Sequence, residues 1–210
     1  MGLSNTREGW GWPARLLHWL MALLILGMLG VGFYMVEIVG DDLIQRFNLT
    51  QMHKSWGVIV FALALLRILW RAVTPSPAPV PMPAWQKTAA QASHLALYAL
   101  MIALPLTGWL MASSSPYNDA DAYVQIRNEV RLTYLFGAET LAALGLEDAL
   151  VWAMPDPYEP GDEALSKRFE QVHLALALAL TAVLGLHVAA ALKHQFIDRD
   201  GLLMRMIRGH

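Results

Sequence analysis

The sequence predicts an all-α integral membrane protein, built as a bundle of four spanning helices. The chain of 210 residues is 56% hydrophobic and only 15% charged, and its mean hydropathy is +0.41. A soluble domain of this length needs far less apolar sequence. The apolar residues also fall into four separate runs, each long enough to cross a hydrocarbon layer about 30 Å thick.

The absence of cysteine and the small net charge exclude several other classes of protein. Without cysteine, the chain cannot form disulfides, cysteine-ligated zinc sites, iron–sulfur clusters or covalently attached c-type haem. The formal net charge of −2 gives no basis for binding nucleic acid. We therefore predict membrane lipid, and no nucleic acid, as the surroundings of the chain.

The first predicted span covers residues 14–38. It follows Pro13, which suits a helix start, and Trp10 and Trp12, which suit a membrane interface. The run is too long for the core of a signal peptide, and no small-residue cleavage site closes it.

The second and third predicted spans cover residues 52–73 and 90–113. A proline-rich connector, TPSPAPVPMPAW, separates them. Because proline lacks the N–H group that a helix needs, we interpret this segment as an extended linker; a proline-recognition motif is the alternative. Pro105 inside the third span predicts a kink that neighbouring helices relieve.

A long polar insertion, residues 114–170, separates the third span from the fourth, which covers residues 171–193. The insertion carries eleven acidic and four basic residues. We interpret its one apolar piece, residues 132–154, as a pair of surface helices, because glycine and acidic residues interrupt it. The spans and the insertion form a single predicted membrane domain over residues 1–210.

Basic residues beside the spans predict the orientation. They gather at both termini and around the proline-rich connector, whereas the insertion has an excess of seven negative charges. Because basic flanks stay in the cytoplasm, four spans place both termini there and the insertion outside.

Histidines in the spans predict a cofactor. His173 and His187 lie fourteen residues apart, which is almost four helical turns and roughly 21 Å of helix. The two imidazoles therefore share one face of the fourth span, near opposite sides of the hydrocarbon layer. A single histidine in a span is more often a buried hydrogen-bonding group than a ligand, but intramembrane histidines are costly and usually functional.

The predicted topology places the histidines at two depths. His53 begins the second span at the outer level, with His173. At the inner level, His187 meets either His18 or His94, and spacing leaves that choice open. Imidazoles are common axial ligands of haem, whereas a closed zinc site needs about four ligands that neither level supplies. We therefore predict two b-type haems, one at each level.

Arg67 lies fourteen residues after His53, on the same helical face. A charge at this depth needs a partner, and a guanidinium can bind a haem propionate through paired hydrogen bonds. We predict this role for Arg67. The alternative is that the side chain extends to the inner interface, which is the role we assign to Arg71.

Four segments together resemble the bacterial cytochrome b561 family of four-helix di-haem membrane proteins. They are LLHW around His18, the start of the second span at His53 with Arg67, SHLALYALMIALPLTGWLM in the third span, and QVH…GLHVAAALKH in the fourth. The resemblance covers nearly all of the chain outside the insertion. It implies that His18 and His187 ligate one haem, and His53 and His173 the other. It also implies a bacterial inner-membrane location and electron exchange with the quinone pool, and some members oxidise superoxide and reduce ubiquinone.

Candidate residues for the two electron partners lie at the ends of the spans. His94 and His194 are candidates near a quinone, because quinone reduction needs proton donors close to cytoplasmic water; an interfacial role is the alternative for His194. At the outer face, the acidic insertion repels a small anion such as superoxide and favours a cationic partner. Lys54, Lys167 and Arg168 lie near the outer pair and would form a local positive funnel.

The combined prediction is a di-haem b-type cytochrome that moves electrons across the inner membrane. It would connect a periplasmic donor, with superoxide as one candidate, to the quinone pool, as an oxidoreductase of the superoxide:ubiquinone type or a related electron-transfer protein. Two alternatives stay open. One is a haem-bearing membrane anchor of a larger oxidoreductase that docks through residues 114–170, and the other is a haem-free, histidine-lined transporter.

Overall fold

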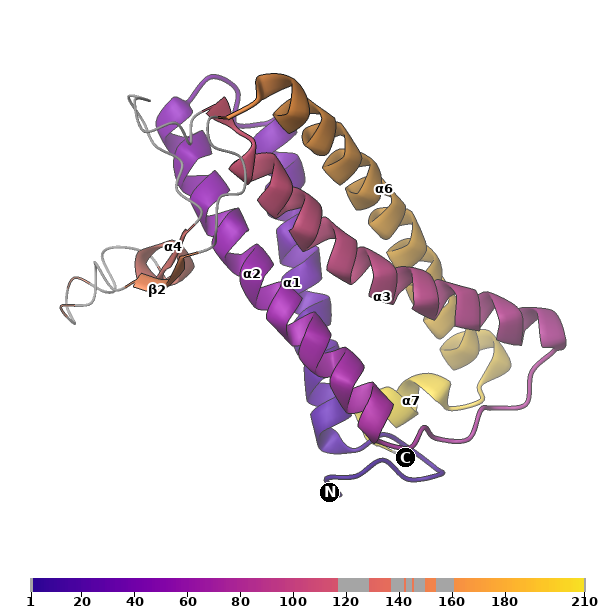
Figure 1. The fold of residues 1–210 in the computed structure, drawn as a ribbon. Coiled ribbons are helices and arrows are strands. Elements are labelled where there is room, and N and C mark those ends of the chain that lie inside the picture. Colours follow the sequence, from indigo (N-terminus) through magenta and orange to yellow (C-terminus); the bar gives the residue numbers. More distant parts are fainter. Residues whose placement is uncertain are drawn as a thin grey trace. The chain divides into compact units, whose positions relative to one another are not determined.

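Four long helices dominate the fold in a computed structural model of the chain (Figure 1). Each contains a stretch that is long and apolar enough to cross a membrane, so the predicted four-helix membrane fold is confirmed. The helices are α1 (Trp12–Glu37), α2 (Leu43–Val73), α3 (Ala84–Ser113) and α6 (Glu163–Lys193). The structure describes residues 2–116, 129–136, 142, 145, 150–153 and 161–209.

Two of the helices begin well before the spans that hydropathy predicts. α2 begins at Leu43 and α6 at Glu163. The carboxylates of Asp42 and Asp162 accept the backbone N–H groups of Gln45 and Leu165, at 2.9 and 3.0 Å, and so cap the two helices. Hydropathy marks the part of a helix that suits hydrocarbon, whereas capping and backbone hydrogen bonds decide where the helix begins.

The described part of the insertion contains two short strands and a short helix. Strand β1 (Glu129–Arg131) pairs antiparallel with β2 (Leu150–Ala153), and α4 (Leu132–Phe136) follows β1. The predicted pair of surface helices over residues 132–154 is therefore wrong at its far end. The sequence LVWA of β2 has the β-branched and aromatic residues that favour a strand, and its partner strand lies about twenty residues earlier, outside any local pattern.

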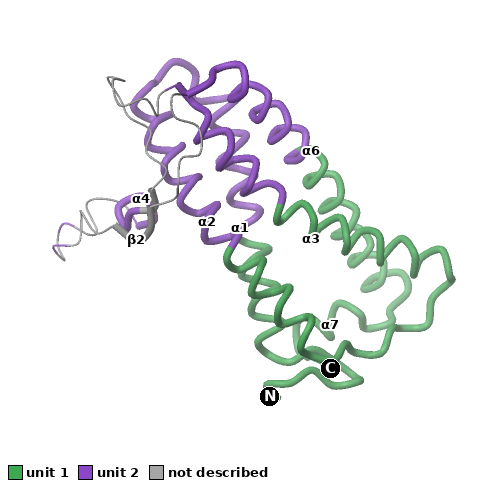
Figure 2. The backbone as a smooth tube through the Cα atoms, in the orientation of Figure 1, with its two compact units in different colours: residues 1–23, 62–102, 178–210 green, residues 24–61, 103–177 purple. Residues whose placement is uncertain are grey.

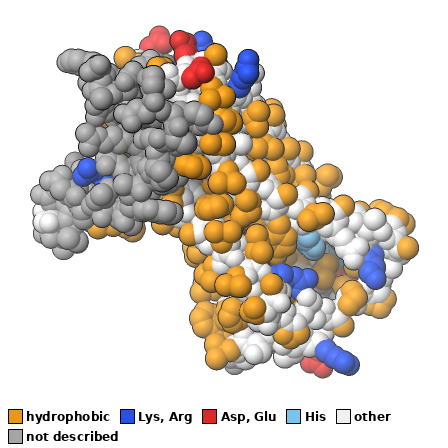
Figure 3. Space-filling model, viewed as in Figure 1, with side chains coloured by type: hydrophobic (Ala, Val, Ile, Leu, Met, Phe, Trp, Pro, Cys, Tyr) orange, Lys and Arg blue, Asp and Glu red, His pale blue; other side chains and the backbone are white. Residues whose placement is uncertain are grey.

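The helices expose large apolar side chains. Leu23, Leu95 and Leu186 are 69%, 72% and 71% exposed, and hydrophobic side chains dominate the face of the molecule in Figure 3. So much exposed apolar surface is unfavourable in water, but it is what helices present to lipid tails. Composition and exposure thus agree on a multi-pass membrane protein.

Two compact units divide the chain (Figure 2). Residues 1–23, 62–102 and 178–210 form unit 1, and residues 24–61 and 103–177 form unit 2. Each long helix contributes one part to each unit. The two predicted histidine levels fall in different units, which are described separately below.

Candidate functional site

Unit 2 brings His53 of α2 and His173 of α6 together. Their ring centres lie 6.4 Å apart, and the ring planes are inclined by 77°. The Nδ1 atom of His53 is buried and has no hydrogen-bond partner among the described residues. The two histidines predicted for the outer level are therefore neighbours in space.

Each ring of this pair packs against a glycine of another helix. A Cβ atom at Gly32 of α1 would lie 3.4 Å from Cε1 of His53, and one at Gly108 of α3 would lie 3.2 Å from Cε1 of His173. The absence of a side chain at Gly108 lets the α3 backbone approach the His173 ring closely, whereas the distance at Gly32 is that of an ordinary contact. Sequence reasoning missed these two glycines, because glycine in a span is also common at ordinary helix contacts.

The His173 ring also has a polar neighbour on α3. Its Nδ1 atom lies 3.1 Å from Oγ1 of Thr107. The sequence gives little signal for this contact, because a threonine inside a helix ordinarily bonds only to its own helix backbone. The position of Thr107 between Pro105 and Gly108 is the sequence feature that could have indicated a special role for this residue.

Unit 1 gathers the residues predicted for the inner level, one from each long helix. The ring centre of His187 lies 6.3 Å from that of His18 and 5.6 Å from that of His94. The rings are inclined by 59° and 65°. We call this set the unit 1 cluster: His18, Arg67, His94 and His187.

The Arg67 guanidinium lies directly beside an imidazole. Its Nη2 atom is 3.0 Å from Nδ1 of His18, and its central carbon is 5.9 Å from the ring centre of Tyr98. A guanidinium has only donors, so Nδ1 of His18 accepts this hydrogen bond. The remaining N–H groups of Arg67 are the ones that could meet a carboxylate.

The ring separations test whether haem iron fits between the imidazoles. A metal–imidazole bond is about 2 Å long and each nitrogen lies about 1.1 Å from its ring centre, so two imidazoles that face one metal have ring centres roughly 6.3 Å apart. The His18–His187 and His53–His173 pairs, at 6.3 and 6.4 Å, match this value, whereas the His94–His187 pair, at 5.6 Å, is shorter. Imidazole pairs without a carboxylate or thiolate in the described clusters suit haem better than zinc.

A further polar cluster lies where α6 ends in the π-helical turn η2 (His194–Asp198). Nδ1 of His194 is 2.5 Å from Oδ2 of Asp200 and 3.3 Å from Oδ2 of Asp198. Asp200 is held in turn by the backbone N–H of Leu202, which donates to its Oδ1 at 3.0 Å. Arg199, which stands between Asp198 and Asp200 in the chain, has a φ of 52°. This conformation is unfavourable for a residue with a side chain, so the surrounding contacts must stabilise the turn.

The charge of Asp200 follows from these contacts. Burial raises the pKa of its carboxyl group, but the Leu202 N–H and His194 outweigh this effect and hold the pKa below its ordinary value. Asp200 is thus an ionised acceptor at neutral pH, and the His194 ring donates to it from Nδ1. Sequence reasoning named His194 but missed Asp200, whose acceptor role depends on the turn at residue 199.

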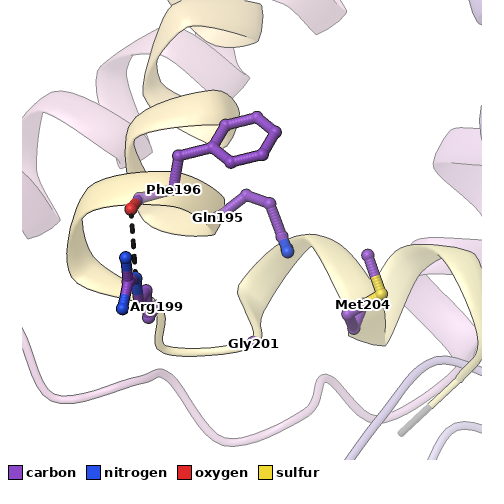
Figure 4. Close-up of a pocket in the computed structure, with 5 residues that line it drawn as sticks. All are labelled: Gln195, Phe196, Arg199, Gly201 and Met204. Carbon is purple, nitrogen blue, oxygen red and sulfur yellow. Dashed lines mark hydrogen bonds between the residues drawn. The ribbon is translucent and has the colours of Figure 1, made fainter.

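An open pocket of about 370 Å³ lies beside the same turn (Figure 4). Its lining combines apolar side chains with a guanidinium and an amide, and Oε1 of Gln195 is buried without a partner among the described residues. Arg199 donates from Nε to the carbonyl oxygen of Phe196 at 3.4 Å. The lining residues are Gln195, Phe196, Arg199, Gly201 and Met204.

The predicted outer funnel residues all belong to unit 2. Lys54 lies about three turns into α2, whereas Lys167 and Arg168 lie near the start of α6. Lys167 forms an exposed ion pair with Glu163, one helical turn earlier, at 2.8 Å. This partner reduces the positive charge that Lys167 presents. Lys54 follows His53 directly on α2, and Arg168 follows Lys167 on α6.

Comparison with known proteins gives the family. The model for the prokaryotic cytochrome b561 family matches residues 9–209. The chain belongs to the prokaryotic cytochrome b561 family. It is 29% identical to cytochrome b561 homolog 2 of Escherichia coli (strain K12), over 99% of this chain and 95% of the relative. It is 28% identical to the probable superoxide oxidase CybB of Yersinia pestis, over 91% of both chains, and 22% identical to E. coli cytochrome b561 homolog 1, over 91% of this chain and 92% of the relative.

Family membership confirms the resemblance seen in the sequence and settles the broad class. The chain is a multi-pass membrane cytochrome b of the bacterial inner membrane, and its cofactor is b-type haem. Its role is electron transfer, as an oxidoreductase with a redox partner. A haem-containing family argues against the alternative of a haem-free transporter.

Proposed function

We propose that this cytochrome holds two b-type haems and moves electrons between a periplasmic donor and the membrane quinone pool. His53 and His173 would ligate one iron, and His18 and His187 the other. The observation that carries the proposal is the pair of ring-centre distances, 6.4 and 6.3 Å, each of which suits two imidazoles on one metal. Bound haem supplies reversible one-electron chemistry at iron.

In the proposed orientation, the chain is a single membrane domain with both termini in the cytoplasm and residues 114–170 in the periplasm. α6 supplies one ligand to each haem, His173 and His187. In this structure Arg67 donates to Nδ1 of His18. Ligation of iron through Nε2 of His18 would leave the ring proton on Nδ1, so Arg67 would give up this hydrogen bond and bind a haem propionate instead. His94, beside His187, is left as a neighbouring polar group rather than a ligand.

His194 is the proposed proton-exchanging residue beside ubiquinone. Because the Nδ1–H group of His194 donates a hydrogen bond to Asp200, Nε2 of His194 is the nitrogen available to a quinone oxygen. The pocket along the same turn has a volume of about 370 Å³, within the roughly 300–1,000 Å³ typical of small-molecule sites. His194 does not line it, but precedes its lining residue Gln195 in the chain. Its apolar and amide side chains suit a quinone head group.

Superoxide is the proposed periplasmic donor. The name of one relative, the probable superoxide oxidase CybB, supports this choice. Lys54, Lys167 and Arg168 would attract the anion toward the His53–His173 pair, against the repulsion of the acidic insertion. That same insertion favours a second candidate function, in which a cationic protein partner docks on it and the chain serves as the haem-bearing anchor of a larger oxidoreductase.

The test measures haem and electron transfer on the purified protein. We expect a Soret band, two haems per chain, and ubiquinone reduction when superoxide is generated outside proteoliposomes. One haem per chain would contradict the di-haem proposal. Two haems without superoxide-driven reduction would contradict the donor, and co-purification of a stoichiometric soluble subunit from native membranes would then favour the anchor function.

A further inference from the structure

The hydroxyl group of Thr107 lies beside Nδ1 of the His173 ring, where it bears on which ring nitrogen carries a proton. Its Oγ1 lies 2.9 Å from the carbonyl oxygens of both Ala103 and Leu104, and 3.1 Å from Nδ1 of His173. A hydroxyl group has one proton to donate and lone pairs to accept with. The two carbonyl oxygens can only accept, so they take the hydroxyl proton. With the proton directed to these carbonyl groups, the hydroxyl oxygen is left to accept from Nδ1 of His173, which then carries a hydrogen.

The assignment also decides which ring nitrogen is left free. A neutral imidazole with its proton on Nδ1 has its free lone pair on Nε2. This tautomer leaves Nε2 as the nitrogen that can bind a metal.

The same turn of α3 also fixes the orientation of the ring. Gly108 follows Thr107, and its backbone approaches the ring so closely that a Cβ atom there would lie 3.2 Å from Cε1 and 3.5 Å from Nδ1. The hydroxyl group and the bare backbone therefore bound one side of the imidazole. Rotation of the ring would break the hydrogen bond or collide with the helix.

We propose that Thr107 is a positioning residue for the haem ligand His173: it selects the Nδ1–H tautomer, fixes the ring, and increases electron donation from the imidazole to iron. This inference rests on the proposed ligation of haem by His53 and His173. A hydrogen bond accepted from the distal N–H of a metal-bound histidine raises the basicity of the ligand. A more basic ligand stabilises ferric over ferrous iron, so Thr107 lowers the midpoint potential of this haem.

The experiment compares Thr107→Val, which is nearly isosteric but cannot accept, with Thr107→Ser, which keeps the hydroxyl group. Redox titration of the purified protein, followed at the haem absorption bands, gives the two midpoint potentials. We expect Thr107→Val to raise one potential, leave the other unchanged, and weaken haem binding at that site by roughly 10- to 100-fold. Thr107→Ser should keep both wild-type potentials. Thr88→Val is the matched control, since Thr88 on the same helix donates to Ala84 in the same way.

His173→Ala separates failure of this inference from failure of the proposed function. If His173→Ala keeps both haems, the proposed ligation is wrong. If it loses one haem while Thr107→Val keeps both potentials unchanged, the ligation stands and the role of Thr107 is overturned. If Thr107→Val loses haem altogether, retention by Thr107→Ser supports the hydrogen bond, whereas loss in both variants shows a packing role and overturns the proposal.

Discussion

The two histidine clusters pair imidazoles at nearly the same separation but surround them with different charges. In unit 2, Nδ1 of His173 donates to a neutral hydroxyl group. In unit 1, Nδ1 of His18 accepts from the Arg67 guanidinium at 3.0 Å. In the proposed di-haem protein, the same type of ligand would serve two electron carriers, because the groups next to the ligands differ.

The difference predicts an order of potentials. A hydrogen-bond acceptor for the N–H group of an imidazole ligand favours ferric iron. A nearby positive charge favours ferrous iron, which has one positive charge fewer. We therefore expect the haem of the unit 1 cluster to have the higher midpoint potential. Electrons would then move favourably from the His53–His173 pair toward the unit 1 cluster, which is the direction from the proposed periplasmic donor to quinone.

The largest expected effect comes from removing one ligand of each pair. His187→Ala should remove the higher-potential haem and leave the other, and His173→Ala should do the reverse. Haem content and redox titration of each purified variant check this, with His94→Ala as the control that keeps two haems. Loss of a haem in His94→Ala, with retention in His18→Ala, would show that His94 is the inner ligand.

Neutralising Arg67 should reduce the contrast between the clusters. Arg67→Gln removes the positive charge beside the proposed haem and its bond to the propionate, so the higher midpoint potential should fall toward the lower one. Charged hydrogen bonds contribute about 1.5–3 kcal/mol, so we expect haem binding at this site to weaken by roughly tenfold or more. Arg67→Lys keeps the charge and should keep most of the potential. An unchanged potential in Arg67→Gln would remove charge as the source of the difference.

Replacing Asp200 should affect proton exchange but neither haem. In Asp200→Asn the anionic acceptor behind His194 is lost, and we expect quinone reduction to slow by roughly tenfold, a small part of what general acid–base groups contribute. The pKa of Asp200 is lowered. The hydrogen bond from His194 to the Asp200 carboxylate is therefore fully formed above the ordinary aspartate pKa of about 4, and it is lost as the pH falls through the lowered pKa. The wild-type rate should show this acidic limb, and the variant should lack it. An identical pH profile in both proteins would contradict the role.

The smallest expected effect tests the close packing around His173. Gly108→Ala places a Cβ atom 3.2 Å from the ring, so the ring must shift, at a cost of about 1 kcal/mol in haem binding. Gly27→Ala is the matched control, because in the described part of the chain a Cβ atom there meets nothing within 4 Å. Each variant is titrated with an apoprotein that competes for haem, and the fraction of haem that the variant retains is measured. Equal retention would show that the close approach of α3 is unimportant.

The sequence predicts the four spans well because hydrocarbon imposes a simple requirement on length and composition. It also predicts which histidines share a level, since helical rise converts spacing into depth. It fails at residues 150–153, where a strand partner distant in the chain overrides local pattern. It fails again at Thr107, Gly108 and Asp200, because each acts through a residue on another segment.

The membrane class, the four long helices and the candidate histidines can be predicted from the sequence, because each depends on properties of a single helix. The group next to each imidazole becomes visible only in the folded chain: a hydroxyl group at His173, a guanidinium at His18 and a carboxylate at His194. Hydrogen bonds act over about 3 Å, and hydropathy and periodicity carry no information at that scale across different segments. The candidate ligands can be recognised in the sequence, but the groups next to them depend on how the segments pack.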